Sequence, residues 1–140
     1  MSIGLRPNSA SSAETTINRP WRKADSSDVW ERYRRNHTIG LYERALDRDP
    51  ENHLLILDLA RAYADAGRDA EAKFMLHRVL ALHPASAIVR AKVARLYAKL
   101  QCPHQALDHY RKVLELDPGF SGEAQIRDAI ATLSEELRRT

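Results

Sequence analysis

The segment MLHRVLALHP, residues 75–84, has two counterparts in the chain, one on either side at the same distance. LYERALDRDP (residues 41–50) begins 34 residues before it, and HYRKVLELDP (residues 109–118) begins 34 residues after it. Each segment has the apolar spacing of an amphipathic helix end and closes with a proline, which does not continue a helix. A fixed period of this length is typical of helical repeat arrays. The sequence therefore predicts an all-α protein built from repeated units.

Small and aromatic residues recur with the same period in two full repeats, at about residues 53–86 and 87–120. The recurring pairs are Leu59-Ala60-x-x-Tyr63 with Val93-Ala94-x-x-Tyr97, and Ala72-x-x-x-Leu76 with Ala106-x-x-x-Tyr110. This pattern resembles the tetratricopeptide repeat, which reads W-x2-L-G-x2-Y, then A-x3-F, then P. The sequence departs from it at the tryptophan place, held by Ile56 and Arg90, and at the glycine place, held by Ala60 and Ala94.

The resemblance implies a right-handed superhelical array of antiparallel helical hairpins, an α-solenoid. It would contain two full repeats, a partial N-terminal repeat and a C-terminal capping helix. The apolar periodicity predicts helices near residues 27–48, 53–66, 69–82, 87–100, 103–116 and 123–138. The recurring alanines are expected where the two helices of a hairpin approach most closely.

The first predicted helix carries only part of a repeat. Ser26 or Ser27 is expected to cap it, because a short polar side chain can accept a hydrogen bond from the first helical turn. Its second half fits the repeat pattern, so residues 27–52 are interpreted as a partial repeat. No turn signal stands where a complete hairpin would bend. One long helix is therefore favoured over two short helices broken near Asn36.

The last predicted helix does not keep the 34-residue register. At strict spacing it would bury Arg127 and Asp128, whereas a shift of two residues places Ile126, Ile130 and Leu133 inward. Burying charged groups costs far more than lengthening a loop by two residues. We therefore expect residues 119–122 to be a lengthened link. The helix at residues 123–138 would cover the open end of the array with a polar outer face.

The N-terminal residues 1–25 are predicted to be a disordered tail, and residues 26–140 the repeat domain, because the tail has little to bury. Residues 1–23 are rich in serine and contain four basic residues and one acidic residue. A mitochondrial transit peptide has such a composition, but so does an ordinary tail, and a cytoplasmic protein with a tail is favoured. Cys102 is the single cysteine, which excludes an internal disulfide.

Residue constellations that carry catalysis are missing from the sequence. No two of the six histidines have the i, i+4 spacing of a helical metal site with a carboxylate between them. The chain has no glycine-rich phosphate loop, no nucleophile elbow and no Cys-x-x-Cys pair. We therefore expect no enzymatic activity, no metal and no cofactor.

One charged region stands out, because residues 72–107 contain no Asp or Glu. In a stacked array the first helix of each hairpin lines the concave face, and residues beside the packing stripe point into the groove. The predicted groove residues are Leu54, Leu57, Asp58 and Arg61 from one helix, and Ile88, Lys92, Arg95 and Lys99 from the next. Such a groove suits an acidic or C-terminal peptide segment, and the alternative is a solvated basic helix face. Nucleic acid is not expected at a net charge of +3 without interleaved aromatic residues.

Three functions are compatible with these features. The favoured one is a non-catalytic adaptor that binds another protein in its concave groove. The second is a self-assembly module that forms a homo-oligomer through Trp30, Tyr33 and His37 of the first helix. The third is an accessory subunit of a separately encoded enzyme. Some tetratricopeptide repeat proteins grip a chaperone's C-terminal carboxylate with a Lys/Asn/Arg set, but Leu57 and Arg61 stand at two of those places, which argues against that type of co-chaperone.

Overall fold

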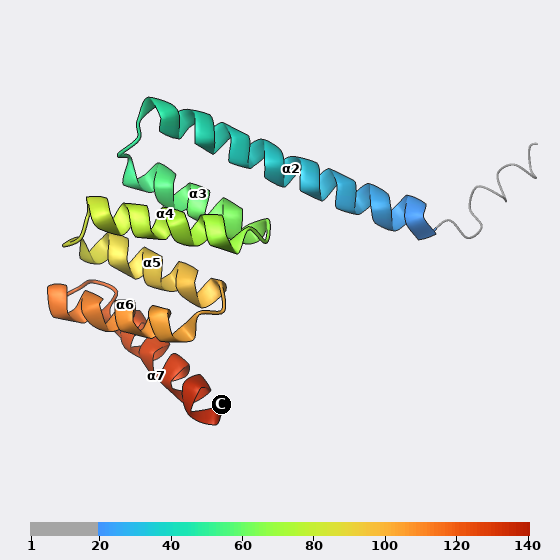
Figure 1. Ribbon diagram of the computed structural model, residues 1–140. Helices are drawn as coiled ribbons and strands as arrows, with labels where there is room; N and C mark the ends of the chain where they lie inside the picture. Colours follow the sequence, from blue (N-terminus) through green and yellow to red (C-terminus); the bar gives the residue numbers. More distant parts are fainter. Residues whose placement is uncertain (1–19) are drawn as a thin grey trace, which may run out of the picture. The chain divides into compact units, whose positions relative to one another are not determined.

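The described part of the chain is entirely helical. The structure, a computed structural model, describes residues 20–140, with side chains from residue 27 onward. Its helices are α2 (Pro20–Arg48), α3 (His53–Asp65), α4 (Asp69–Leu82), α5 (Ala87–Lys99), α6 (Pro103–Leu116) and α7 (Glu123–Arg139), as Figure 1 shows. The described residues contain no strand, so the prediction of an all-α helical repeat solenoid is confirmed.

Helix α2 differs from its prediction at its beginning. It starts at Pro20, where the fixed φ of proline suits the first turn of a helix, so the expected cap at Ser26 or Ser27 lies inside it. Residues 20–25 are therefore helical rather than part of the disordered tail. The rest of that predicted tail lies outside the described residues. The helix is continuous through Asn36, so the alternative of two short helices is wrong.

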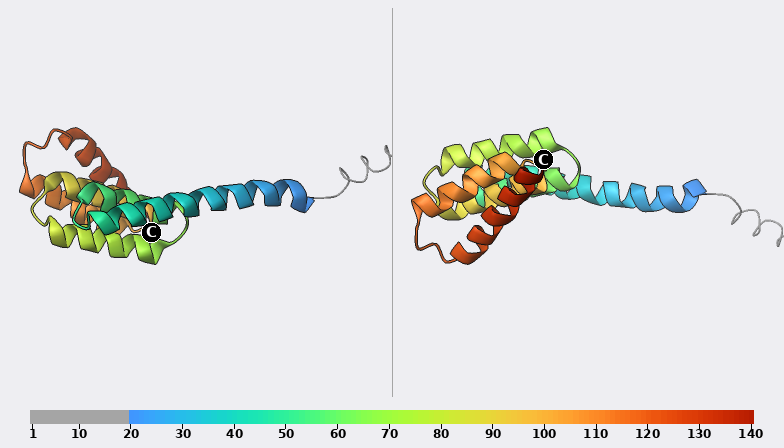
Figure 2. Two further views of the ribbon diagram at one scale, coloured as in Figure 1. Left: turned by 90° about the horizontal axis from the view of Figure 1, so that it is seen from above. Right: turned by 90° about the horizontal axis from the view of Figure 1, so that it is seen from below.

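The chain divides into two compact units, Met1–Arg34 and Arg35–Thr140. The structure describes only the beginning of α2 in the first unit. The second unit contains the rest of α2 and the other five described helices, which follow one another along a stack in chain order. Helix α7 lies at the far end of that stack, and it is nearest to the viewer in the right-hand view of Figure 2, which is seen from below. The limits proposed for the individual repeats remain predictions.

The two full hairpins, α3 with α4 and α5 with α6, pack through the recurring small residues. Ala60, Ala72, Ala94 and Ala106 are fully buried, each with 0% of its surface exposed. A side chain of one carbon at these four places lets the helix axes approach closely. The largest fully buried side chains of the core are Ile56, Leu59, Leu76, Val79, Val93 and Val113. The alanine positions are therefore where the sequence predicted them, inside the helix contacts.

The hairpin turns share one backbone conformation although their sequences differ. Gly67 has φ of 77°, and Gln101, one period later, has φ of 64°. In each turn the next amide donates to a tyrosine carbonyl, from Arg68 to Tyr63 at 2.8 Å and from Cys102 to Tyr97 at 2.9 Å. These bonds satisfy carbonyls left open at the helix end. The repeat geometry therefore holds a non-glycine residue in a conformation that glycine adopts more easily.

The second half of α2 is joined to the stack by apolar and polar contacts. Ile39 and Leu46 are buried in the common core, with 2% and 6% of their surface exposed. The Tyr63 hydroxyl on α3 donates to the Glu43 carboxylate on α2 at 2.6 Å. Burial, together with this carboxylate, raises the pKa of Tyr63 to about 12. These contacts support the interpretation that this half of α2 acts as the second helix of a partial repeat.

Helix α7 adopts the shifted register. Ile126 and Leu133 are its buried residues, with 5% and 7% of their surface exposed, while Arg127 and Asp128 are exposed. The link before it turns through hydrogen bonds from the Phe120 amide to the Asp117 carbonyl and from the Glu123 amide to the Phe120 carbonyl. The longer link therefore turns the apolar stripe of α7 toward α6, as the cost of burying charge predicted.

A cationic and aromatic cluster lies between α5 and α6. Arg90, at the tryptophan place of the repeat, donates to the Pro84 carbonyl at 2.9 Å and lies 3.1 Å from Nδ1 of His109. The His109 ring stacks on Tyr97 with centroids 5.3 Å apart. Burial, and then the positive charge of Arg90, lower the pKa of His109 below 6.5, while His77 adds to this effect and Asp108 opposes it. Arg90 is therefore part of the hairpin packing, away from the predicted groove.

This cluster predicts that stability falls in mild acid. Because the pKa of His109 is lower in the folded chain, the unfolded chain binds more protons once the pH falls below about 6.5. The stabilisation that comes from keeping His109 neutral is therefore fully present above that pH. It is lost as the pH falls through the pKa that His109 has in the folded chain. His109→Gln should flatten the dependence of the melting temperature on pH between about 7.5 and 5. His104→Gln, at an exposed position of the same helix, should leave the slope unchanged.

Candidate partner-binding groove

Helices α3 and α5 place equivalent repeat positions next to each other on one face of the stack. A recess of about 200 Å³ lies between them. Its lining residues are Leu54, Leu57, Asp58 and Arg61 from α3, and Lys92, Arg95 and Leu96 from α5. The structure thus brings together six of the eight predicted groove residues. Leu96 is the one member of this recess that the sequence analysis did not name.

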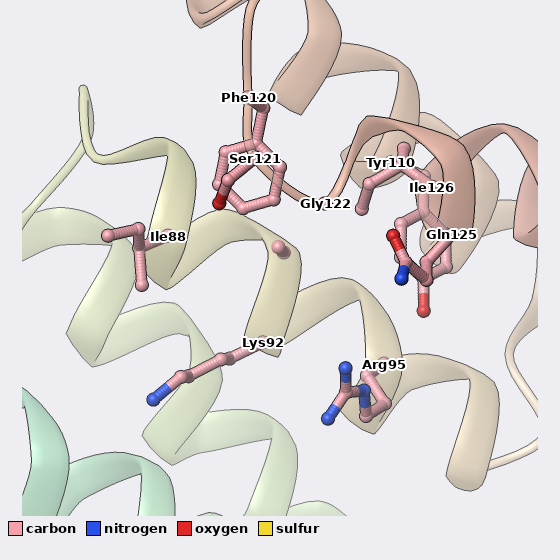
Figure 3. A pocket seen from close by; sticks show the side chains of 10 residues that line it. Ile88, Lys92, Arg95, Tyr110, Phe120, Ser121, Gly122, Gln125 and Ile126 are labelled. Carbon is pink, nitrogen blue, oxygen red and sulfur yellow. The ribbon is translucent and has the colours of Figure 1, made fainter.

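A second and larger recess lies on the other side of α5 (Figure 3). It has a volume of about 520 Å³ and is bounded by α5, α6, α7 and the link before α7. The lining residues are Ile88, Ala91, Lys92, Arg95, Tyr110, Phe120, Ser121, Gly122, Gln125 and Ile126. The predicted groove residue Ile88 belongs here rather than to the first recess. The sequence analysis missed Phe120 and Gln125, because it interpreted the longer link only as a spacer.

Two of the predicted cations are neutralised by nearby carboxylates. Arg61 pairs with Asp58 one turn earlier on α3, at 3.1 Å. Lys99 pairs with Asp65 across the α3–α5 contact and lines neither recess. Arg61 and Lys99 therefore each share their charge with a carboxylate of α3, which lies outside the acid-free stretch of residues 72–107.

Lys92 and Arg95 have different surroundings. Both side chains are exposed and line both recesses, so they form a cationic ridge between the two. No carboxylate of the described residues forms a salt bridge with either of them. Burial raises the pKa of Tyr110, and the charge of Arg95 and its hydrogen bond to the phenol oppose that rise. The ridge therefore keeps two positive charges that are not paired in a salt bridge, with Asp58 as an acidic residue in one of the two recesses.

Solvent-exposed apolar side chains lie on either side of this ridge. Leu54 at the start of α3 and Ile88 at the start of α5 stand one repeat apart and expose 52% and 60% of their surface. Exposed aliphatic groups beside a cationic ridge can bury against a ligand's own apolar side chains, with a gain of roughly 25 cal/mol per Å² removed from water. The arrangement suits recognition of a segment that combines acidic and apolar residues.

The rest of the described chain offers little catalytic chemistry. No group of three His, Cys, Asp or Glu side chains among the described residues could hold a metal ion. No helix in the described part of the chain is long and apolar enough to cross a bilayer. The thiol of Cys102 is half-buried at a hairpin turn, 3.6 Å from the Leu100 carbonyl.

Comparison with known proteins identifies the repeats. Residues 36–100 match the family model described as "Tetratricopeptide repeat". The chain is 36% identical over 64 residues to the tetratricopeptide repeat and J domain-containing co-chaperone DNJ1 of Fusarium oxysporum f. sp. lycopersici, a match that covers 46% of this chain and 12% of that protein. The chain therefore spans only a small part of this curated relative.

Two solved structures share the fold. MamA MSR-1 C2 matches with a TM-score of 0.56 at 23% identity, over 74% of this chain and 57% of its own. The first tetratricopeptide repeat domain of Spaghetti (RPAP3), bound to the HSP90 peptide SRMEEVD, matches with a TM-score of 0.55 at 24% identity, over 80% of this chain and 90% of its own. Together with the 34-residue period and the buried alanines, the family match shows that residues 36–100 consist of tetratricopeptide repeats, and the two solved structures share their fold.

Proposed function

We propose that the protein is a non-catalytic adaptor that holds an acidic segment of a partner protein across α3 and α5. The observation that carries this proposal is the ridge of Lys92 and Arg95, which lines both recesses and forms no salt bridge with a carboxylate of the described residues. The tetratricopeptide repeat is a module for protein–protein interaction, which favours a protein segment over a metabolite as the ligand. Carboxylates of that segment would replace water at the two cations.

The expected binding energy has two sources. Carboxylate groups would accept charge-assisted hydrogen bonds from Lys92 and Arg95, which are about twice as strong as bonds between neutral groups. Apolar residues of the same segment would cover Leu54, Leu57 and Ile88. Arg61 and Lys99 would contribute less, since each already shares its charge with a carboxylate. The proposal therefore ranks the four predicted cations, with Lys92 and Arg95 first.

One comparison supports the acidic character of the partner. The HSP90 peptide SRMEEVD held by the Spaghetti (RPAP3) domain contains three acidic residues in seven. The present groove differs at Leu57 and Arg61, which replace the Lys and Asn of the carboxylate-gripping set, so we do not propose the same ligand. What the two have in common under this proposal is an acidic peptide as the ligand.

The first test reverses the charges of the ridge. Lys92→Glu/Arg95→Glu should weaken binding at least about tenfold, because both positive contacts become repulsive. The probe is a displayed peptide library with blocked ends, from which binders of the native protein are selected and their dissociation constants measured. Arg111→Glu/Lys112→Glu is the matched control, since it makes the same change in net charge on exposed positions of α6 outside both recesses.

Two further results would support the ridge as the binding site. The selected peptides should be enriched in Asp and Glu, and their affinity should decrease as salt is added, because exposed charges are screened over about 10 Å at 0.1 M salt. The thermal stability of the reversed variant should match that of the control variant. Equal binding by native and reversed proteins, without salt dependence, would mean that the basic stretch is only a solvated helix face.

A second candidate function rests on the exposed residues of α2. Val29, Trp30 and Tyr33 expose 53%, 61% and 59% of their surface, and the rings of Trp30 and Tyr33 meet edge to face with centroids 6.0 Å apart. Exposed aromatic residues at helical spacing are typical of contacts with another chain. This observation favours self-assembly of two copies through α2, with His37 at the margin of the contact.

Self-assembly predicts a mass that depends on concentration. Sedimentation of the native protein should then show a dimer at micromolar concentration, and Trp30→Ala/Tyr33→Ala should shift the mass to that of a monomer. Arg32→Ala, at an exposed position of the same segment, is the control. A native protein that remains monomeric over the whole range would exclude this function and leave the adaptor proposal untouched.

A further inference from the structure

The recess between α5 and α7 has features that a terminal cap does not require. A capping helix needs an apolar inner face and a polar outer face. Here the link and α7 also enclose about 520 Å³, which falls within the roughly 300–1,000 Å³ typical of ligand pockets. The recess between α3 and α5 is less than half as large. The C-terminal end of the array therefore contributes the larger of the two recesses.

The lining of this larger recess is polarised. Ile88 and Phe120 lie toward one end, and Arg95, Tyr110 and Gln125 lie toward the other, as Figure 3 shows. No Asp or Glu belongs to the lining. The first recess, in contrast, includes Asp58. An anionic group would therefore meet hydrogen-bond donors and positive charge at one end of this recess, next to an apolar surface at the other.

A glycine shapes the apolar end. Gly122 precedes α7, and a Cβ atom built there would lie 3.0 Å from Cε2 and 3.4 Å from Cδ2 of the Phe120 ring. Any larger residue would have to displace that ring. The ring is half-buried and packs against the core while still lining the recess. The link thus provides both the ring of Phe120 and, at Gly122, the space beside it.

We propose that the recess between α5 and α7 binds an apolar side chain of the partner segment that adjoins an internal Asp or Glu. This inference rests on the proposed function and deepens it. The carboxylate lies at Lys92 and Arg95, the neighbouring apolar side chain lies against Phe120 and Ile88, and Gln125 donates to the segment's backbone or carboxylate. An apolar residue on the other side of the acid lies against Leu54 and Leu57. Helix α7 is then part of the binding site as well as a cap.

The occupant is deduced from the charge and the size of the lining. Two cations without a salt-bridge partner favour an acidic group, and a recess of about 520 Å³ has room for more than one side chain. Because Lys92 and Arg95 line both recesses, a carboxylate placed on them has a recess with apolar lining residues on either side. The recognised pattern is therefore apolar, acidic, apolar, within the interior of a chain.

The test uses a library of acetylated and amidated peptides in which the central residue is either Glu or Gln and the flanking residues are random. Blocked ends exclude recognition of a terminal carboxylate. The native protein should enrich Leu, Ile, Met or Phe on both sides of the Glu. Phe120→Ala should lose that enrichment on one side only, and Leu54→Ala should lose it on the opposite side only, while both variants still require the Glu.

A second variant tests the recess without removing a core side chain, in case Phe120→Ala fails to fold. Ser121→Trp adds a large ring at an exposed lining position without removing a core contact. It should weaken a selected peptide about tenfold, and it should leave the affinity of the same peptide with Ala at the affected flank unchanged. Helicity and the melting temperature of both variants are measured alongside binding.

The outcomes separate this inference from the proposed function. If binding requires the Glu and is lost in Lys92→Glu/Arg95→Glu, but Phe120→Ala and Ser121→Trp select the same peptides as the native protein, the α5–α7 site is wrong and the adaptor proposal stands. If the native protein selects peptides without regard to the Glu, both proposals fail. Loss of the apolar preference on a single flank in both variants supports the site.

Discussion

Replacing both Ala60 and Ala94 with leucine is expected to destabilise the protein strongly. Each alanine has 0% of its surface exposed and belongs to the core of its hairpin. Extra methylene groups in a close-packed contact typically cost about 1–3 kcal/mol per site, since the helices must separate or the side chain must leave its preferred rotamer. The double variant should therefore lose about 2–6 kcal/mol in the free energy of unfolding if the sites are independent.

Denaturant unfolding followed by circular dichroism measures this effect, with each single variant included. Ala81→Leu is the matched control, because Ala81 is exposed on α4 and its substitution should change stability by less than about 0.5 kcal/mol. The loss in the double variant is a large share of the roughly 5–15 kcal/mol that stabilises a typical domain. A double variant as stable as Ala81→Leu would show that the assigned register of the hairpins is wrong.

Leu133→Ala, and separately Ile126→Ala, should each lower the free energy of unfolding by about 2–5 kcal/mol. Both are buried residues of α7, with 7% and 5% of their surface exposed, and truncation leaves a cavity against the preceding hairpin. Because the last repeat has a neighbour on one side only, part of the loss should appear as local release of α7. Hydrogen exchange of the α7 amides should therefore accelerate more than that of α3.

Arg127→Ala provides the control for this prediction. Arg127 pairs with Glu123 at 2.7 Å and is exposed, so its loss should cost less than about 1 kcal/mol. At strict 34-residue spacing, Arg127 would have been the inward residue and Ile126 a surface residue. A larger cost for Arg127→Ala than for Ile126→Ala would therefore favour the unshifted register. In that register Ile126 would face solvent and could not line the recess.

The sequence was most informative where a position's burial depends on helical periodicity alone. The 34-residue recurrence placed Ala60 and Ala94 inside the helix contacts, and both are fully buried. The comparison of two registers for the last helix was decided by the cost of burying Arg127 and Asp128, and the structure exposes both. Apolar burial is a property of one helix face, which a short stretch of sequence specifies.

The beginning of α2 was predicted less well. The described side chains before Ile39 are all exposed. Apolar periodicity reports burial, so it has little to say about a helix segment whose described side chains are exposed. A serine that could cap a helix was therefore taken for its beginning.

The sequence by itself determined the repeat fold, the hairpin register and the face that carries the predicted groove. Only the tertiary structure decided which cations remain available there, because Asp65 on α3 neutralises Lys99 from a position 34 residues away. Only the tertiary structure joined Phe120 and Gln125 to Lys92 and Arg95 in one recess. The physical reason is the same in both cases. Charge compensation and recess shape depend on distances between helices, and the period of a single helix does not contain those distances.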